Sequence, residues 1–180
     1  MSHRLWPRVL ALALMLAVAL VAGTAVAASK KAPKKATVTA KSSFKIKPNK
    51  FFQDNARFRP GNIVIASGGT LTLRNADKEE PHTFSIVAKG DVPKGTNKIL
   101  NCGSPGTICD KIFTGHQPDQ QGNPTVPVVN VGAAGVDQPG DSFILNPKSS
   151  QKVNVSAKKG TTLYFMCGIH GWMQGKIRVR

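Results

Sequence analysis

The C-terminal segment, residues 163–179, decides the fold. It reads Leu163-Tyr164-Phe165-Met166-Cys167-Gly168-Ile169-His170-Gly171-Trp172-Met173-Gln174-Gly175-Lys176-Ile177-Arg178-Val179. Residues 161–167 and 176–179 have the aromatic, β-branched and alternating composition that is typical of half-buried β-strands. A short stretch that contains glycine separates them. The segment therefore predicts a strand, a tight loop and a closing strand at the end of a β-rich domain.

Three soft side chains lie in this loop, Cys167, His170 and Met173, with the spacing Cys-x2-His-x2-Met. A short loop can bring them around one ion, whereas an extended chain would separate them by about 3.3 Å per residue. Such polarisable donors suit copper, with zinc as the commoner competitor for cysteine and histidine. His82 follows a strand and a turn and begins another strand, so it is the candidate for a fourth metal ligand. Two histidines, a cysteine and a weak axial methionine form the ligand set of blue-copper electron-transfer sites.

Short segments with a period of two continue along the chain. The candidate strands are residues 44–47, 51–58, 63–66, 70–75, 82–88, 143–145, 152–156, 161–167 and 176–179. Glycine, proline, asparagine and aspartate separate them, and no window shows a helical stripe. This pattern predicts an all-β domain, an antiparallel sandwich or a barrel. Residues 90–140 form a stretch too long for an ordinary loop, and we expect an insertion with one or two short strands.

The motifs together resemble the cupredoxins, the type 1 blue copper proteins. The resemblance covers about half of the chain after residue 27, and it is carried by residues 58–65, residues 69–75, Pro81-His82-Thr83, and the segment from Tyr164 to Val179. It implies a Greek-key β-sandwich with one type 1 copper ion. It also implies that Nδ1 of His82, Nδ1 of His170 and Sγ of Cys167 bind this ion, with Sδ of Met173 as a weak axial ligand.

Two features depart from the cupredoxin pattern. Thr83 stands where the family often has an asparagine that braces the ligand loop, and its side chain reaches less far, which puts the bracing in doubt. The segment between His82 and Cys167 is longer than is usual in the family. We expect the insertion, residues 90–140, to cover one side of the domain or to bind a partner.

The other two cysteines, Cys102 and Cys109, lie within the insertion. Glycine, serine and proline between them can turn the chain back, so outside the cytoplasm a disulfide is the leading interpretation, worth about 2–3 kcal/mol in the chain-entropy model. The alternative is a second metal site that includes His116, although two thiols and one distant histidine are an incomplete ligand set. Met166 points opposite to Cys167 along a strand, so we expect it to serve packing.

Residues 1–27 have the pattern of a signal peptide. Arg4 and Arg8 lie in a basic start, an apolar run follows from Val9, and small residues end at Ala27. The alternative is an uncleaved membrane anchor, since the apolar stretch is just long enough to span a bilayer. Cleavage after Ala27 predicts an extracytoplasmic protein, periplasmic or secreted.

The formal net charge of +16 is concentrated near the N-terminus. Residues 29–50 hold eight lysines and no acidic residue. We expect residues 28–43 to form a basic flexible tail and residues 44–180 to form the cupredoxin-like domain. Such a tail can be drawn to an anionic membrane, a cell-wall polymer or an acidic protein. Export from the cytoplasm makes nucleic acid an improbable partner.

These observations favour a secreted one-electron carrier that is not an enzyme by itself and serves redox partner proteins with acidic surfaces. The first alternative is an extracytoplasmic copper storage or delivery protein, which the same ligands could serve. The second is a binding module whose function lies in the basic tail and the insertion. Reversible redox cycling without loss of copper separates the carrier from the delivery protein. Surface binding that survives copper removal identifies the binding module.

Overall fold

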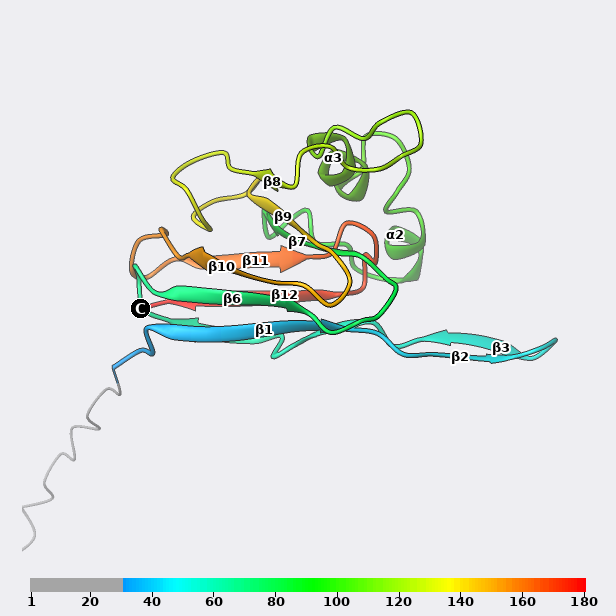
Figure 1. Cartoon of the computed structure of the whole chain (residues 1–180), viewed down its shortest axis with the longest axis horizontal. Coiled ribbons are helices and arrows are strands. Elements are labelled where there is room, and N and C mark those ends of the chain that lie inside the picture. Colours follow the sequence, from blue (N-terminus) through cyan, green and yellow to red (C-terminus); the bar gives the residue numbers. More distant parts are fainter. Residues whose placement is uncertain (1–30) are drawn as a thin grey trace, which may run out of the picture. The chain divides into compact units, whose positions relative to one another are not determined.

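The computed structural model describes residues 31–180, so the expected signal peptide, residues 1–27, lies outside the described residues. The strands of this part of the chain form two β-sheets and one separate hairpin (Figure 1). The first sheet has the strand order β10 (Ser150–Asn154), β6 (Thr70–Asn75), β1 (Lys35–Lys41) and β4 (Arg57–Arg59). The second has the order β5 (Asn62–Ile65), β12 (Gln174–Val179), β11 (Thr162–Met166), β7 (His82–Val87), β9 (Ser142–Leu145) and β8 (Val128–Val129).

Strands that are consecutive in the sequence mostly belong to different sheets. The chain passes from β4 to β5, from β5 to β6 and from β6 to β7, changing sheet each time. β1 pairs with β6 in parallel, as β5 does with β12, and the other pairs in these two sheets are antiparallel. Such crossing connections characterise a Greek-key sandwich. The expected all-β sandwich is confirmed.

Apolar side chains from both sheets form the main core. Alternate residues of β11 and the residue after it point into this core, namely Leu163, Phe165 and Cys167. The ring of Phe165 stacks on that of Phe84 with centroids 4.5 Å apart, and it meets the edge of Phe58 at 5.2 Å. Burial of each large apolar side chain contributes about 1.5–3 kcal/mol, so this packing fixes where the strand ends and where Cys167 lies.

The insertion contains two short helices, α2 (Thr96–Leu100) and α3 (Ile108–Gly115), as well as β8. The sequence predicted one or two short strands in the insertion and showed no helical stripe, because helices this short leave no periodic stripe in the sequence. Only Cys109 and Ile112 of α3 are buried. The expected disulfide between Cys102 and Cys109 is present, which excludes a metal site on these two sulfurs.

A second cluster of apolar side chains lies between the insertion and the six-stranded sheet. Its buried members are Val87, Cys102, Cys109, Ile112 and Met166. Met166 therefore packs on the opposite side of β11 from Cys167, as expected. Because the insertion covers the outer face of the sheet here, every residue of β7 is buried. The strand that begins at His82 is thus enclosed on both faces.

The N-terminal boundary of the domain differs from the expectation. Residues 28–43 were expected to be a flexible tail and the domain to begin at residue 44. Instead, residues 35–41 form β1, which lies between β6 and β4 in the first sheet. Val38 and Ala40 are fully buried. The lysines around these small apolar residues obscure a strand that is polar on one face and buried on the other.

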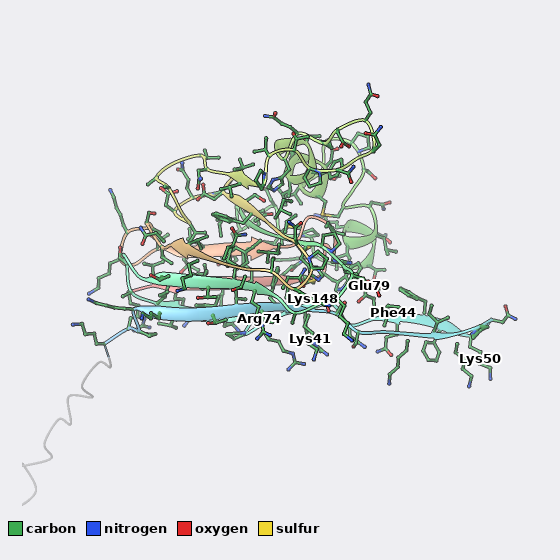
Figure 2. All side chains as sticks on the ribbon, in the orientation of Figure 1. Lys41, Phe44, Lys50, Arg74, Glu79 and Lys148 are labelled. Atoms are coloured by element: carbon green, nitrogen blue, oxygen red, sulfur yellow. A yellow bond between two sulfur atoms is a disulfide. The ribbon has the colours of Figure 1, made fainter. Side chains whose placement is uncertain are left out.

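A hairpin of β2 (Phe44–Lys47) and β3 (Phe51–Asp54) extends away from the two sheets (Figure 1). We call residues 44–54 the arm. The sequence predicted one continuous strand over residues 51–58, but the chain bends after β3, where the Ala56 N–H donates to the Asp54 carboxylate at 2.7 Å. Figure 2 shows Phe44 near the base of the arm and Lys50 near its tip. Within residues 31–180, no helix is both long enough and apolar enough to cross a bilayer.

Candidate metal centre

Two neighbouring strands bring the candidate ligands together. His82 is the first residue of β7 and Cys167 directly follows β11, and the two strands pair antiparallel. Two backbone hydrogen bonds close the loop between Cys167 and Met173. The Cys167 N–H donates to the Met173 carbonyl at 3.0 Å, and the Met173 N–H donates to the His170 carbonyl at 2.8 Å. The loop therefore brings His170 back to Cys167, as its spacing predicted.

Three donor atoms form a compact triangle. Nδ1 of His82 lies 3.2 Å from Nδ1 of His170, and Sγ of Cys167 lies 3.9 and 3.8 Å from these nitrogens. Typical zinc–nitrogen and zinc–sulfur bond lengths place two nitrogens roughly 3.4–3.6 Å apart and a nitrogen and a sulfur roughly 3.6–3.8 Å apart around one ion. His82 and Cys167 are fully buried. The donor set therefore fits one soft metal ion enclosed by protein.

Met173 is the remaining candidate ligand. It is fully buried and belongs to the same core cluster as Cys167. Both polar groups of its backbone are used in closing the loop. The thioether is thus the group of Met173 that remains available to bind a metal, and a thioether is a weak, soft donor.

Asp77 holds His82 from the side away from the triangle. Nε2–H of His82 donates to Asp77 Oδ2 at 2.7 Å, and the same carboxylate accepts the backbone N–H of Ser42. Because a carboxylate accepts the hydrogen bond, the neutral ring of His82 carries its proton on Nε2 and keeps a lone pair on Nδ1. Burial raises the pKa of Asp77, but the hydrogen bonds from His82 and Ser42 outweigh it and lower the pKa.

His170 is the ligand candidate nearest to solvent among the three nitrogen and sulfur donors. Its side chain is 13% exposed, and its Nε2 lies 4.0 Å from Oδ2 of Asp54 at the base of the arm. The ring of Trp172 meets it edge-on, with centroids 5.2 Å apart. Trp172 itself is 40% exposed. The pair of rings connects the buried triangle to the protein surface.

Thr83 contacts the ligand loop in two ways. Its backbone N–H points to Cys167 Sγ at 3.4 Å, and its side-chain Oγ1 accepts the N–H of Gly168 at 2.7 Å. The sequence left the bracing of the loop in doubt because threonine replaces the longer asparagine. In the structure, the threonine hydroxyl reaches the loop directly.

Hydrogen bonds in the triangle alter the acidity of its members. Burial raises the pKa of the Cys167 thiol, but hydrogen bonds from His170, from His82 when its ring is protonated on both nitrogens, and from the Thr83 backbone outweigh it and lower the pKa to about 6. Burial lowers the pKa of His82, but its hydrogen bonds with Cys167 and Asp77 outweigh it and raise the pKa. Near neutral pH the sulfur is therefore a thiolate, which is the form that binds metals.

The four residues that the sequence singled out as ligands thus lie at one end of the sandwich, on β7 and in the loop after β11. The sequence did not indicate the two carboxylates that approach the histidines. Asp77 is one of the aspartates that separate predicted strands, and Asp54 lies within the strand predicted over residues 51–58. A carboxylate five residues before a predicted histidine ligand is a signal that could have revealed Asp77, since metal-binding histidines commonly donate to a carboxylate.

No protein-family model and no curated protein matches the chain. Solved structures similar to it include the reduced auracyanin from Roseiflexus castenholzii, with 16% identity, a TM-score of 0.45, and coverage of 83% of this chain and 99% of that one. A purple cupredoxin from Nitrosopumilus maritimus has 16% identity, a TM-score of 0.42, and coverage of 81% and 99%. Oxidised plastocyanin from Dryopteris crassirhizoma has 20% identity, a TM-score of 0.36, and coverage of 81% and 100%. These names belong to the class that the sequence resembles. What the metal site of this chain can do therefore follows from the donor atoms of this chain, not from those similar structures.

Proposed function

We propose that the protein is an extracytoplasmic one-electron carrier that turns over no substrate by itself. It would hold one type 1 copper ion through Nδ1 of His82, Nδ1 of His170 and Sγ of Cys167, with Sδ of Met173 as a weak fourth ligand. The buried triangle of one thiolate and two imidazoles carries this proposal. When bound, copper supplies a one-electron couple between Cu(I) and Cu(II).

The chain supplies a rigid frame for these ligands. Asp77 fixes the ring of His82, the backbone closes the loop from Cys167 to Met173, and Thr83 holds Gly168. Groups held by buried hydrogen bonds and core packing keep nearly one arrangement, which limits the reorganisation that accompanies electron transfer. A rigid site favours a carrier over a delivery protein, since delivery requires ligands that release the metal.

We propose that electrons pass through His170, because it is the one nitrogen ligand with solvent exposure. Ile169 and Trp172 on either side of it are large, exposed apolar residues. An apolar surface of this kind suits brief contact with a partner protein.

The proposed partner is a redox protein with an acidic surface. The arm, whose base lies beside His170, carries Lys45, Lys47 and Lys50, and its one acidic residue is Asp54. Its other side chains include exposed aromatic rings, among them Phe52, which is 67% exposed. Basic groups beside an electron exit steer an acidic partner towards it. An anionic membrane or cell-wall surface is the alternative partner for the same charges.

The extracytoplasmic location is part of the proposal. The disulfide between Cys102 and Cys109 supports it, because disulfides persist in oxidising compartments. We expect the exported protein to begin at Ala28, which mass spectrometry of the intact protein measures. A mass that includes residues 1–27 would instead favour the uncleaved membrane anchor.

Redox cycling in the presence of a Cu(I) chelator tests the function. The copper-loaded protein is oxidised and reduced repeatedly, and copper in the chelator and in the protein is measured after each cycle. A carrier keeps its copper and its redox response through many cycles. Rapid loss of Cu(I) to the chelator would contradict the carrier and favour storage or delivery.

A further inference from the structure

A row of hydrogen-bonded polar side chains runs from the insertion to the ligand loop. Nε2 of His116 lies 2.7 Å from Oγ of Ser142, which lies 2.7 Å from Oγ of Ser85. Oγ of Ser85 lies 2.9 Å from Oγ1 of Thr83, which accepts the N–H of Gly168. All four side chains are buried. Every distance is that of a good hydrogen bond, so these groups form one continuous relay.

One backbone carbonyl sets the direction of the relay. Nδ1 of His116 lies 2.6 Å from the carbonyl oxygen of Val126. A carbonyl only accepts, so Nδ1 carries the proton, and Nε2 of the neutral ring is an acceptor. Ser142 therefore donates to His116, Ser85 donates to Ser142, and Thr83 donates to Ser85.

The direction in which the relay donates determines how the hydroxyl of Thr83, its last member, is oriented. Because the proton of the Thr83 hydroxyl points to Ser85, the oxygen presents a lone pair to the N–H of Gly168. If Nε2 of His116 carried a proton instead, the hydroxyls would donate in the opposite direction. Thr83 would then accept from Ser85 as well as from the N–H of Gly168, and its own buried proton would have no acceptor in the relay. Burial lowers the pKa of His116, which keeps the ring neutral.

The insertion touches the same loop residue a second time. A Cβ placed on Gly168 would lie 2.7 Å from Cγ2 of Ile112 in α3. The insertion thus packs against Gly168 and also anchors the relay that hydrogen-bonds to it. The two contacts are independent, one apolar and one polar.

We propose that His116 is a positioning residue for the metal centre. Through the relay it orients the Thr83 hydroxyl, so that Thr83 accepts the Gly168 N–H and holds the loop beside Cys167. This role rests on the proposed function only in that the loop is taken to bind the metal. It also gives the insertion a task within the site.

The tautomer of His116 is the most direct test, and the metal-free protein serves for it. Two-dimensional ¹⁵N–¹H NMR correlation of the imidazole rings is expected to show a protonated Nδ1 and an unprotonated Nε2 for His116 at pH 7. A proton on Nε2 would overturn the proposal, because the relay would then run the other way. Since copper is absent, this outcome is independent of whether the protein is an electron carrier.

Amide hydrogen exchange at Gly168 tests the far end of the relay. Thr83→Val is expected to speed exchange about three- to tenfold, the amount that corresponds to one lost hydrogen bond, and Thr83→Ser is expected to keep the wild-type rate. Ser142→Ala, which cuts the relay two members away, is expected to speed it at least about twofold. Ser67→Ala is the control, because its hydroxyl binds a backbone carbonyl outside the relay.

An unchanged rate in Ser142→Ala, together with a faster rate in Thr83→Val, would mean that Thr83 acts alone, and it would overturn the role of His116. His116→Gln, which keeps an acceptor for Ser142, is compared with His116→Leu, which has none. The proposal expects faster Gly168 exchange in the leucine variant than in the glutamine variant. Equal rates would contradict it. Far-UV circular dichroism establishes that each variant is folded.

Discussion

At the scale of single residues, the site depends on side chains that are not ligand candidates themselves. Asp77 determines which nitrogen of His82 keeps its lone pair, and Thr83 contacts the residues on both sides of the Cys167–Gly168 bond. Asn75 holds the segment before His82 by donating to the carbonyls of Glu80 and Leu145. The donor triangle is therefore built by its surroundings before a metal binds.

The Asp77→Asn variant is expected to bind copper about 10–100-fold more weakly, which is the usual effect of removing the partner of a metal-binding histidine. The amide of the introduced asparagine is neutral, so it lacks the full negative charge with which the Asp77 carboxylate stabilises the proton on Nε2 of His82. Competition with a chelator of known affinity measures the change. Asp119→Asn, in an exposed turn, is the matched control. Equal affinities of the two variants would contradict the role given to Asp77.

The stability that His116 contributes is expected to depend on pH. Burial lowers the pKa of His116 below its usual value of 6.5, so the unfolded state binds a proton more readily than the folded state does. Its contribution is therefore complete above about pH 6.5 and is lost as the pH falls through the folded-state pKa. Urea unfolding of the wild type and of His116→Leu should show a stability difference that shifts against the wild type between pH 7 and pH 5. A difference independent of pH would contradict this.

At the scale of elements, strands were predictable where apolar and polar residues alternate clearly and where glycine, proline, asparagine or aspartate marks both ends. Residues 70–75 were predicted as a strand and form β6, whose inward residues Leu71 and Leu73 are fully buried. β1 was missed because its lysines suggest a solvated tail, and α3 because it has barely two turns. The ligand residues were found because Cys167, His170 and Met173 lie in one loop. The relay was not predicted, since His116, Ser142 and Ser85 are far apart in the sequence.

The contact between α3 and the ligand loop can be tested at Gly168. Gly168→Ala places a methyl group 2.7 Å from Cγ2 of Ile112, and the overpacking is expected to cost about 1–3 kcal/mol of stability. In a double-mutant cycle with Ile112→Ala, the double variant should be less destabilised than the sum of the two single variants. Strict additivity would mean that the two residues do not press on each other.

At the scale of the whole described molecule, the charge is unevenly placed. Lysines gather on the arm, whose base reaches His170, while the basic pair Lys158 and Lys159 precedes β11 and so lies at the opposite end of that strand from Cys167. The arm contacts the two sheets little and presents Phe44, Ile46 and other apolar side chains to solvent. An isolated two-stranded hairpin is marginally stable in water, so the arm is suited to a bound partner.

Charge reversal on the arm is expected to slow electron exchange with an anionic oxidant. For the copper-loaded, reduced protein, the rate of oxidation by ferricyanide should fall several-fold in Lys45→Glu/Lys47→Glu at low ionic strength, and the effect should vanish in high salt. Lys158→Glu/Lys159→Glu changes the total charge equally and is the control. Equal slowing by both pairs would show that only net charge matters and would contradict steering by the arm.

The visible absorption spectrum of the copper-loaded protein tests the central claim most directly. A copper ion bound by the buried Cys167 thiolate and the two imidazoles predicts an intense thiolate-to-copper band. The band should disappear in Cys167→Ser and persist in Met166→Leu, which changes a sulfur that packs on the other side of β11. A colourless protein that binds Cu(II), or a band that survives in Cys167→Ser, would contradict the claim.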